Sequence, residues 1–309
     1  MPKYWSKASI AFSSVFEGGM KIRKVPLTVL DEKVLLTKAT DAEIREAKGL
    51  PYAEMTGVMS YPAGNCKFEM RYVISLLGSH RSGFSVAQFN ICKKAFEYGY
   101  ATRDLGLIYS NGLDPHGKNV LWATADSGHS VPRSQGCRIV FMNGAAVSFR
   151  SKKHSLSASS TCVDEIIELY EASTDVLGLR NLMAELGCYQ QDPSVIYQDN
   201  KSSIQIANNR GSLGVTSRAI DLKTLNVRNR IEDHQVKTKY CATDNMIADM
   251  GTKALSEIPF CTHRDAINGY ALVRASFPDL VLPSYVCSLS IEKVKIMISL
   301  IPLISLEDF

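Results

Sequence analysis

The sequence predicts an α/β protein built on a mixed five-stranded sheet flanked by helices. Between residues 119 and 256, β-type and helical segments follow in the order three strands, helix, strand, helix, helix, strand, helix. Ahead of them, from Pro51 to about Ser110, the periodicity is helical, which predicts a small, mainly helical segment before the sheet. With 45% hydrophobic and 21% charged residues in a chain of 309, enough apolar mass is present for a packed core.

The first three predicted strands are short apolar segments separated by turn residues. They cover 119–126, 136–144 and 145–153, and the dipeptide Asn143-Gly144 joins the second to the third as a hairpin turn. An amphipathic stretch over 159–187 then predicts a long helix, in which Thr161 and Asp164 fit a capping box and Gly187 marks the end.

The second half of this region predicts two further strands and three helices. A buried-type strand over 194–200 leads into a short helix beginning at Lys201. A basic amphipathic helix over 218–233, a strand over 235–243 and a final helix over 245–255 complete the unit.

The helical segment ahead of the sheet carries two residues that oppose helix formation. Pro62 removes a backbone donor and Gly99 lowers helix stability, so we expect interruptions at both positions. The first fifty residues show weak periodicity, and both they and the tail 275–309 are expected to be less ordered, or packed less tightly, than 119–256. The stretch 109–119 is dense in turn residues and is the best candidate for a domain boundary.

Composition excludes several classes of protein. The net charge of +4 does not by itself indicate a nucleic-acid binder, so local clusters must carry any such argument. The eight cysteines are scattered singly without zinc-ligand spacing, which is typical of reduced thiols in an intracellular protein, cytoplasmic or nuclear. The longest apolar run, 294–306, is too short to span a bilayer, so we expect no membrane association.

Four acidic residues stand out by their places in the predicted elements. Asp126 ends the first strand and Asp199 ends the fourth; if these strands are parallel neighbours, both carboxylates emerge at one sheet edge. Glu165, in the first turn of the helix over 159–187, and Asp249, near the start of the helix over 245–255, can reach the same place. Clustered carboxylates repel one another unless cations lie between them, and Mg²⁺ prefers such oxygen ligands. Two ions about 3.5–4 Å apart hydrolyse phosphodiesters in many enzymes.

Each of these residues also has a purely structural interpretation. Asp199, which precedes Asn200, could cap the helix that follows, and Glu165 could complement the helix dipole. Asp126 could be a turn residue, and Asp249 could lie on a solvated helix face. For each residue alone, the structural interpretation is at least as good as the metal-site interpretation. The four residues together, in this order of elements, favour a metal site.

Three sequence blocks from the same region resemble a known family in order and spacing. "GAAVSFRSKKHSLSASSTCVDE" resembles "GGPISWRSKKQPTVALSSTEAE", "VIYQDNKSSIQIANN" resembles "IYCDNQSAIALAKN", and "KYCATDNMIADMGTKAL" resembles "EYVPTEDQLADILTKPL". These are motifs of copia-type retrotransposon Pol polyproteins, in the region where the reverse transcriptase connection leads into RNase H. The resemblance runs from about Pro51 to Val273.

The resemblance implies an RNase H-like fold and a division of the chain. It implies a remnant or linker over 1–50, a connection-like helical segment over 51–115, an RNase H domain over 116–273 and an unassigned tail over 274–309. The reverse transcriptase motif "YVDD" is absent, so polymerase activity is not expected.

Motif by motif, the resemblance also implies which residues act. Glu165 matches the second glutamate of "STEAE", Asp199 the aspartate of "CDN", and Asp249 that of "LAD". Asp126 matches the second aspartate of "DADWAGD", whereas the first is Thr124 here. These four carboxylates are the expected catalytic set and the expected ligands of two Mg²⁺ ions, with Mn²⁺ as an alternative. Backbone contacts to the nucleic acid are expected from a basic set: Arg150, Lys152, Lys153, Arg218, Lys223 and Arg228.

The function implied is cleavage of the RNA strand of RNA–DNA hybrids, either alone or beside other parts of a retroelement Pol polyprotein. The alternative is a truncated, inactive relic that still folds and binds nucleic acid or serves structurally. Ala219 and Leu225, which replace histidines of the family motif, favour the relic, as does Thr124, whereas the retained carboxylates favour the enzyme. For any single basic residue, a solvated surface position remains an equal interpretation.

Overall fold

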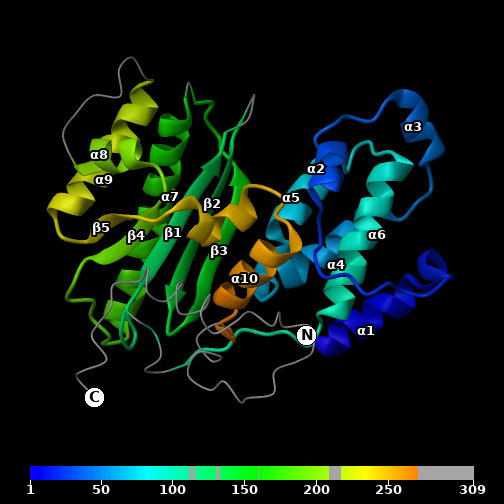
Figure 1. The fold of residues 1–309 in the computed structure, drawn as a ribbon, viewed down its shortest axis with the longest axis horizontal. Coiled ribbons are helices and arrows are strands. Elements are labelled where there is room, and N and C mark those ends of the chain that lie inside the picture. The colour runs from blue at the N-terminus through cyan, green and yellow to red at the C-terminus, as the bar shows by residue number, and fades with distance from the viewer. Residues whose placement is uncertain (111–113, 115, 130–132, 159, 209–216, 271–309) are drawn as a thin grey trace. The chain divides into compact units, whose positions relative to one another are not determined.

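The computed structural model describes residues 1–110, 114, 116–129, 133–158, 160–208 and 217–270. Among these, a first compact unit comprises 1–107 with 253–265, and a second comprises 108–252 with 266–270 (Figure 1). The segment predicted as a tail, 274–309, lies outside the described residues. Within the described part, no helix combines the length and hydropathy needed to cross a membrane.

The first unit is helical. Short 3₁₀ turns, Ser13–Phe16 and Phe68–Met70, connect some of its helices. The α-helices are α1 (Pro2–Ala11), α2 (Val29–Leu35), α3 (Asp41–Glu46), α4 (Tyr52–Asn65), α5 (Arg71–Gly78), α6 (Val86–Ala101) and most of α10 (Glu257–Ile267).

The predicted helix interruptions at Pro62 and Gly99 are wrong, because tertiary contacts accommodate both residues. Pro62 cannot donate to the carbonyl of Val58, four residues earlier; the hydroxyl of Tyr4 donates to that carbonyl instead, at 2.8 Å. At Gly99 a side chain would collide with the indole of Trp5, so the absence of a Cβ permits the contact between α1 and α6. Both helices therefore continue through these positions.

Residues 1–50 form packed helices, although fewer of their side chains are buried than in 119–256. Trp5 and Leu35 are fully buried, and the rings of Trp5 and Phe96 meet edge to face at 5.5 Å. Thr28 and Thr40 each cap a helix through a reciprocal capping box. Periodicity did not reveal these helices because they are only six to ten residues long.

The second unit contains the predicted mixed five-stranded sheet, in the order β3-β2-β1-β4-β5 (Figure 1). β1 pairs antiparallel with β2 and parallel with β4; β2–β3 is antiparallel and β4–β5 parallel. Asn143 and Gly144, with φ of 52° and 86°, form the predicted hairpin turn. The strands are β1 (Trp122–Gly128), β2 (Gln135–Met142), β3 (Ala145–Lys153), β4 (Ser194–Gln198) and β5 (Val236–Tyr240).

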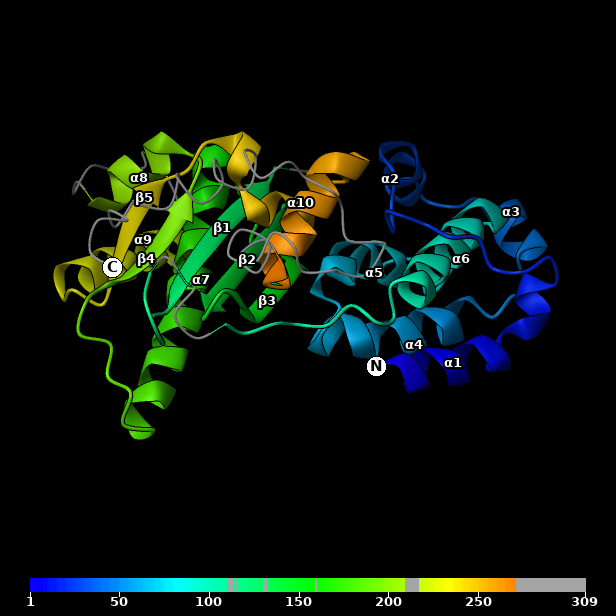
Figure 2. The same cartoon turned by 60° about the horizontal axis from the view of Figure 1, so that its bottom comes forward.

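Three helices cover one face of this sheet: α7 (Thr161–Glu185), α8 (Lys201–Asn208) and α9 (Arg218–Glu232) (Figure 2). Their apolar side chains form one core with alternate residues of the strands, such as Ala123 and Ala125 of β1 and Ile196 of β4. Residues Thr124 and Asp126, in the alternating positions of β1, therefore belong to the opposite face.

Two local predictions in this unit need correction. The cap of α7 is Ser160, whose side chain accepts from the N–H of Val163, so Thr161 is the first residue of the helix. The final helix predicted over 245–255 is instead two 3₁₀ turns, η3 (Thr243–Asn245) and η4 (Ile247–Gly251). η4 packs closely on the sheet: Ser151 Oγ donates to the carbonyl of Gly251 at 2.6 Å, and a side chain at Gly251 would collide with Cys137. The fold requires a tight turn here, which overrides helix propensity.

Candidate metal centre

Three of the four predicted carboxylates converge at the carboxyl ends of β1 and β4. The parallel register sets Ala123 opposite Ile196 and Thr124 opposite Tyr197, and continuing it sets Asp126 opposite Asp199. Glu165 reaches the same place from the second turn of α7. One oxygen from each carboxylate lies within 4.8 Å of the other two, and Asp126 and Glu165 are buried.

Neighbouring polar groups fix Glu165. The amide of Gln198, the last residue of β4, donates to the Glu165 carboxylate at 2.9 Å and to its backbone carbonyl at 2.8 Å. The N–H of Ser127 donates to the other carboxylate oxygen at 3.3 Å. Ser203 in turn donates to Gln198 at 2.7 Å and fixes the orientation of its amide.

Two threonines from the segment after β5 fix the aspartates. Thr252 donates to Asp126 at 2.5 Å, and Thr243 donates to Asp199 at 2.7 Å. Neither threonine, nor Gln198, was identified from the sequence. Thr252 and Asp126 are 126 residues apart, so no local pattern links them.

The electrostatics of the cluster centre on Glu165. Burial raises the pKa of the Glu165 carboxyl, and the negative charges of Asp126 and Asp199 raise it further. The hydrogen bonds from Gln198 and Ser127 lower that pKa but do not offset the rise. The carboxylates therefore lie close together at an electrostatic cost that a bound cation would relieve.

The structural interpretations of these three residues do not fit their positions. The N–H of Ser203 in α8 donates to the side chain of Asn200, so Asn200 makes the capping contact proposed for Asp199. Asp126 lies inside β1 rather than in a turn. Glu165 points to Gln198 and Ser127 rather than to the free N–H groups of its own helix.

Asp249, the fourth predicted carboxylate, is buried on η4 and is not part of the three-residue cluster. It lies near the cluster, since Thr252 donates both to Asp126 and to the backbone carbonyl of Asp249. The pKa of the Cys241 thiol is raised to about 11, mainly by burial and then by the charge of Asp199. The charge of Asp249 makes a smaller contribution in the same direction. Its role as a ligand stays a prediction.

Thr124, which stands where the family motif has its first aspartate, lies two residues before Asp126 on the same face of β1. Its side chain is 3% exposed, and within the described residues its hydroxyl has no hydrogen-bond partner. A buried hydroxyl without a partner is unusual in a folded protein. At this position the family motif has a carboxylate, whereas the carboxylate that joins the cluster from β1 is Asp126.

The predicted basic residues divide into two groups. Lys152, Lys153 and Arg218 are exposed, as is Arg150, whose guanidinium lies 3.5 Å from Asp175. Two others make contacts within the unit: Lys223 pairs with Glu171 at 2.5 Å, and Arg228 donates to the carbonyl of Ile206. Their contact with nucleic acid stays a prediction.

A second buried polar group on α7 was not predicted. His154 contacts Asp164 at 3.3 Å and Glu168 at 2.8 Å, and His129 contacts Asp164 at 2.6 Å. Arg138 of β2 donates to Glu168 at 3.1 Å. The sequence signal for this group was the pair of acidic residues Asp164 and Glu168, which lie one turn apart on a helix that was assigned from its apolar periodicity.

Chemically, the cluster of Asp126, Glu165 and Asp199 suits a hard divalent cation. The donor set consists of carboxylate oxygens, which Mg²⁺ prefers, and it contains no thiolate or imidazole of the kind zinc or copper favours. Gln198 and the two threonines supply the outer hydrogen bonds that orient metal-binding carboxylates.

No family model matches the chain. Among curated proteins, it is similar to the Transposon Ty1-LR3, Ty1-PR1 and Ty1-GR2 Gag-Pol polyproteins of Saccharomyces cerevisiae, each 26% identical over 207 residues. The match covers 65% of this chain but only 12% of each polyprotein.

Three solved structures with RNase H or reverse transcriptase descriptions are similar at low sequence identity. LC11-RNase H1 in complex with an RNA/DNA hybrid has 11% identity and a TM-score of 0.32, covering 42% of this chain and 91% of that one. The N-terminal RNase H domain of rv2228c from Mycobacterium tuberculosis has 11% identity and a TM-score of 0.34, covering 52% and 99%. The foamy viral protease-reverse transcriptase in complex with double-stranded DNA has 11% identity and a TM-score of 0.37, covering 70% and 35%.

The copia-type motifs identified in the sequence agree with these relatives, and the mixed sheet agrees with the fold that the motifs imply. The chain is thus similar in sequence to the Ty1 Gag-Pol polyproteins over 207 residues, and its second unit is an α/β domain with the mixed five-stranded sheet that the sequence predicts.

Proposed function

We propose that the second unit is a ribonuclease H that hydrolyses the RNA strand of RNA–DNA hybrids with two divalent cations. The observation that carries this proposal is the convergence of Asp126, Glu165 and Asp199 at the carboxyl ends of two parallel strands. Homology to retrotransposon Gag-Pol polyproteins supports a substrate formed during reverse transcription.

In this proposal the three carboxylates hold the cations, and Asp249 completes the set from η4. Bound Mg²⁺ would supply an activated water and stabilise the leaving 3′ oxygen. The chain itself contributes orientation: Gln198 fixes the rotamer of Glu165, and Thr252 fixes that of Asp126. These fixed carboxylates limit where the scissile phosphate can bind, so less orientational entropy has to be lost when the reaction begins.

The exposed basic residues would position the hybrid. Lys152, Lys153 and Arg218 are free to approach phosphates, whereas Lys223 and Arg228 would first have to leave their partners. We therefore expect the first three to contribute more to affinity, and mainly through salt-dependent phosphate contacts.

The test is cleavage of a fluorescent RNA–DNA hybrid by the purified full chain with Mg²⁺, beside duplex RNA and duplex DNA of the same sequence. The proposal expects cleavage of the hybrid alone, its loss on chelation, and its loss in Asp199→Asn. Asp233→Asn, at an exposed position after α9, is the matched control and should cleave at the parent rate.

A folded relic that binds without cutting is the second candidate, favoured by the threonine at position 124. Absence of cleavage by the parent chain would favour the relic. In that case Thr124→Asp distinguishes a single missing ligand from a wider loss of the nuclease site. Gain of cleavage in this variant would show that only the ligand at position 124 is missing. Absence of cleavage in both chains would exclude a nuclease built on this cluster.

A further inference from the structure

A row of three side chains crosses the antiparallel part of the sheet at the level of the carboxylate cluster. Asp126 of β1 lies opposite Cys137 of β2, and Cys137 lies opposite Ser151 of β3. Residues directly opposite each other in antiparallel strands have their side chains on one face, here the face opposite α7, α8 and α9. All three side chains are buried, so a segment other than these helices covers the row.

The end of η4 lies over this row. A Cβ at Gly251, the last residue of η4, would be 2.2 Å from the sulfur of Cys137 and 3.3 Å from the Cβ of Ser151. Only glycine leaves room for so close an approach. At the end of β1, a Cβ at Gly128 would be 3.1 Å from the carbonyl oxygen of Thr252. The segment of Gly251 and Thr252 therefore lies directly on the sheet, across β2 and the end of β1.

Hydrogen bonds hold this segment at both ends of the row. On the β3 side, Ser151 Oγ donates to the carbonyl of Gly251 at 2.6 Å, and Gln135 Nε2 donates to Ser151 Oγ at 2.7 Å. On the β1 side, the hydroxyl of Thr252 donates to Asp126 Oδ2 at 2.5 Å. Because the carbonyl of Gly251 belongs to the peptide that leads into Thr252, fixing that carbonyl limits where the Thr252 hydroxyl can lie.

We propose that Ser151 is a positioning residue for the metal centre, which acts through Thr252 on Asp126. Ser151 holds the peptide between Gly251 and Thr252, and this peptide sets the place from which the Thr252 hydroxyl reaches the carboxylate. The inference rests on the proposed function in one respect, because it takes Asp126 as a metal ligand. Loss of a hydrogen bond to a ligating carboxylate typically weakens metal binding by about 10–100-fold, and Ser151 controls such a bond from two strands away.

The experiment is calorimetric titration of the full chain with Mg²⁺, without nucleic acid and well below the melting temperature of each variant. Thr252→Val, which removes the hydroxyl, should weaken Mg²⁺ binding by about 10–100-fold. Ser151→Ala should weaken it by at least about threefold, because the Thr252 hydroxyl remains but is no longer held in place. The double variant should bind Mg²⁺ as Thr252→Val does, since Ser151 has no effect once the hydroxyl that it positions is gone.

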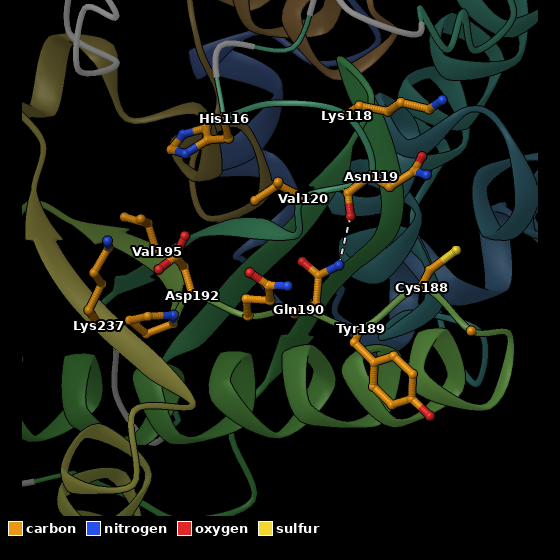
Figure 3. Close-up of a pocket in the computed structure, with 13 residues that line it drawn as sticks. His116, Lys118, Asn119, Val120, Cys188, Tyr189, Gln190, Asp192, Val195 and Lys237 are labelled. Carbon is orange, nitrogen blue, oxygen red and sulfur yellow. Dashed lines mark hydrogen bonds between the residues drawn. The ribbon is translucent and has the colours of Figure 1, made fainter.

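Two control variants distinguish positioning from a general loss of stability. Ser148→Ala is the matched substitution at a half-buried position of the same strand. Gln190→Ala removes a link ahead of the other end of β1, where the Gln190 amide donates to the carbonyl of Asn119 at 2.7 Å beside a pocket of about 570 Å³ (Figure 3). Asp126 lies near the carboxyl end of β1, so both variants should bind Mg²⁺ as the parent does, even where Gln190→Ala lowers the melting temperature.

Unchanged Mg²⁺ affinity in Ser151→Ala overturns the proposal, whether or not the melting temperature falls. So does a double variant in which the two single effects multiply, or a parent chain that binds no Mg²⁺. Ser151→Cys, a weaker donor of nearly the same size, should weaken binding in the same direction and replaces Ser151→Ala if that variant does not fold. Absence of hybrid cleavage by a parent chain that binds Mg²⁺ contradicts the nuclease alone, because the titrations contain no nucleic acid.

Discussion

Neighbouring acidic residues of α7 belong to two polar groups that differ in their partners. Asp164 and Glu168 contact His154, and Glu168 also contacts Arg138, so cationic side chains of the fold surround them. Glu165, between them in sequence, instead meets two further carboxylates and the neutral amide of Gln198. Consecutive residues of one helix thus face opposite electrostatic environments.

The pKa values of the two groups express this difference. Burial opposes ionisation of Asp164, but its hydrogen bonds to His154, His129 and Ser134 outweigh burial and lower its pKa. For Glu165, burial and the neighbouring carboxylates raise the pKa. A buried acid matched by cations of the fold contributes to stability, whereas carboxylates that gather and raise the pKa of one among them favour an external cation.

The largest expected effect is the loss of hybrid cleavage when the group of Glu165, Asp126 and Asp199 is altered. In Asp199→Asn the hybrid-cleavage rate should fall by at least about 1,000-fold, beyond the 10–100-fold that outer-shell partners typically cost. Thermal stability without metal should stay level or rise, because one repelling charge is removed while the Thr243 hydroxyl keeps an acceptor. Cleavage rate and melting temperature are measured on one preparation, and unchanged cleavage would reject Asp199 as a ligand.

Substitution in the group of Asp164 and Glu168, which cationic side chains surround, should instead lower the stability of the fold. Glu168→Gln removes one buried carboxylate from Arg138 and His154, which keep Asp175 and Asp164 as partners, so the free energy of unfolding should fall by about 2–3 kcal/mol. Glu185→Gln, at an exposed position on the same helix, should change it by less than about 0.5 kcal/mol. Urea unfolding measures both, and a silent Glu168→Gln would mean that this group is not a stabilising network.

The pH dependence of stability sharpens the same contrast. Burial opposes charging of His154, but its hydrogen bonds and ion pairs with Asp164 and Glu168 outweigh burial and raise its pKa to about 9. A folded-state pKa above the unfolded value of about 6.5 stabilises the fold below pH 6.5, and this contribution is lost as the pH rises through 9. We expect a loss of about 2–3 kcal/mol across this window, measured by urea unfolding. The loss should be smaller in His154→Asn than in the parent chain, because Glu165, whose pKa is also raised, contributes to the loss in both chains. An equal loss in both chains would assign it to groups other than His154.

The smallest effect is stabilisation by the metal itself. A cation that binds only the folded chain raises the free energy of unfolding by about 1–2 kcal/mol at roughly ten times its Kd. Mg²⁺ should therefore raise the melting temperature of the parent chain, and chelation should reverse the rise. The shift should shrink in Asp199→Asn and persist in Asp233→Asn; a shift of equal size in all three chains would indicate binding elsewhere.

The sequence by itself determined the elements that depend on local chemistry. The Asn143-Gly144 hairpin and the end of α7 at Gly187 follow from residues that adopt positive φ readily, and the structure has them as predicted. The order of elements predicted that the strands of Asp126 and Asp199 are neighbours, and the parallel pairing of β1 with β4 confirms it. These features need only information held within a few residues, or the general rules of sheet topology.

Only the tertiary structure decided the features that join distant residues. α4 continues through Pro62 because Tyr4 satisfies the carbonyl of Val58, and Thr252 orients Asp126 from 126 residues away. The opposite environments of Asp164 and Glu165 likewise depend on which residues outside α7 each side chain contacts. Local propensity carries no record of such partners, because a hydrogen bond or charge acts through distance in space rather than separation along the chain.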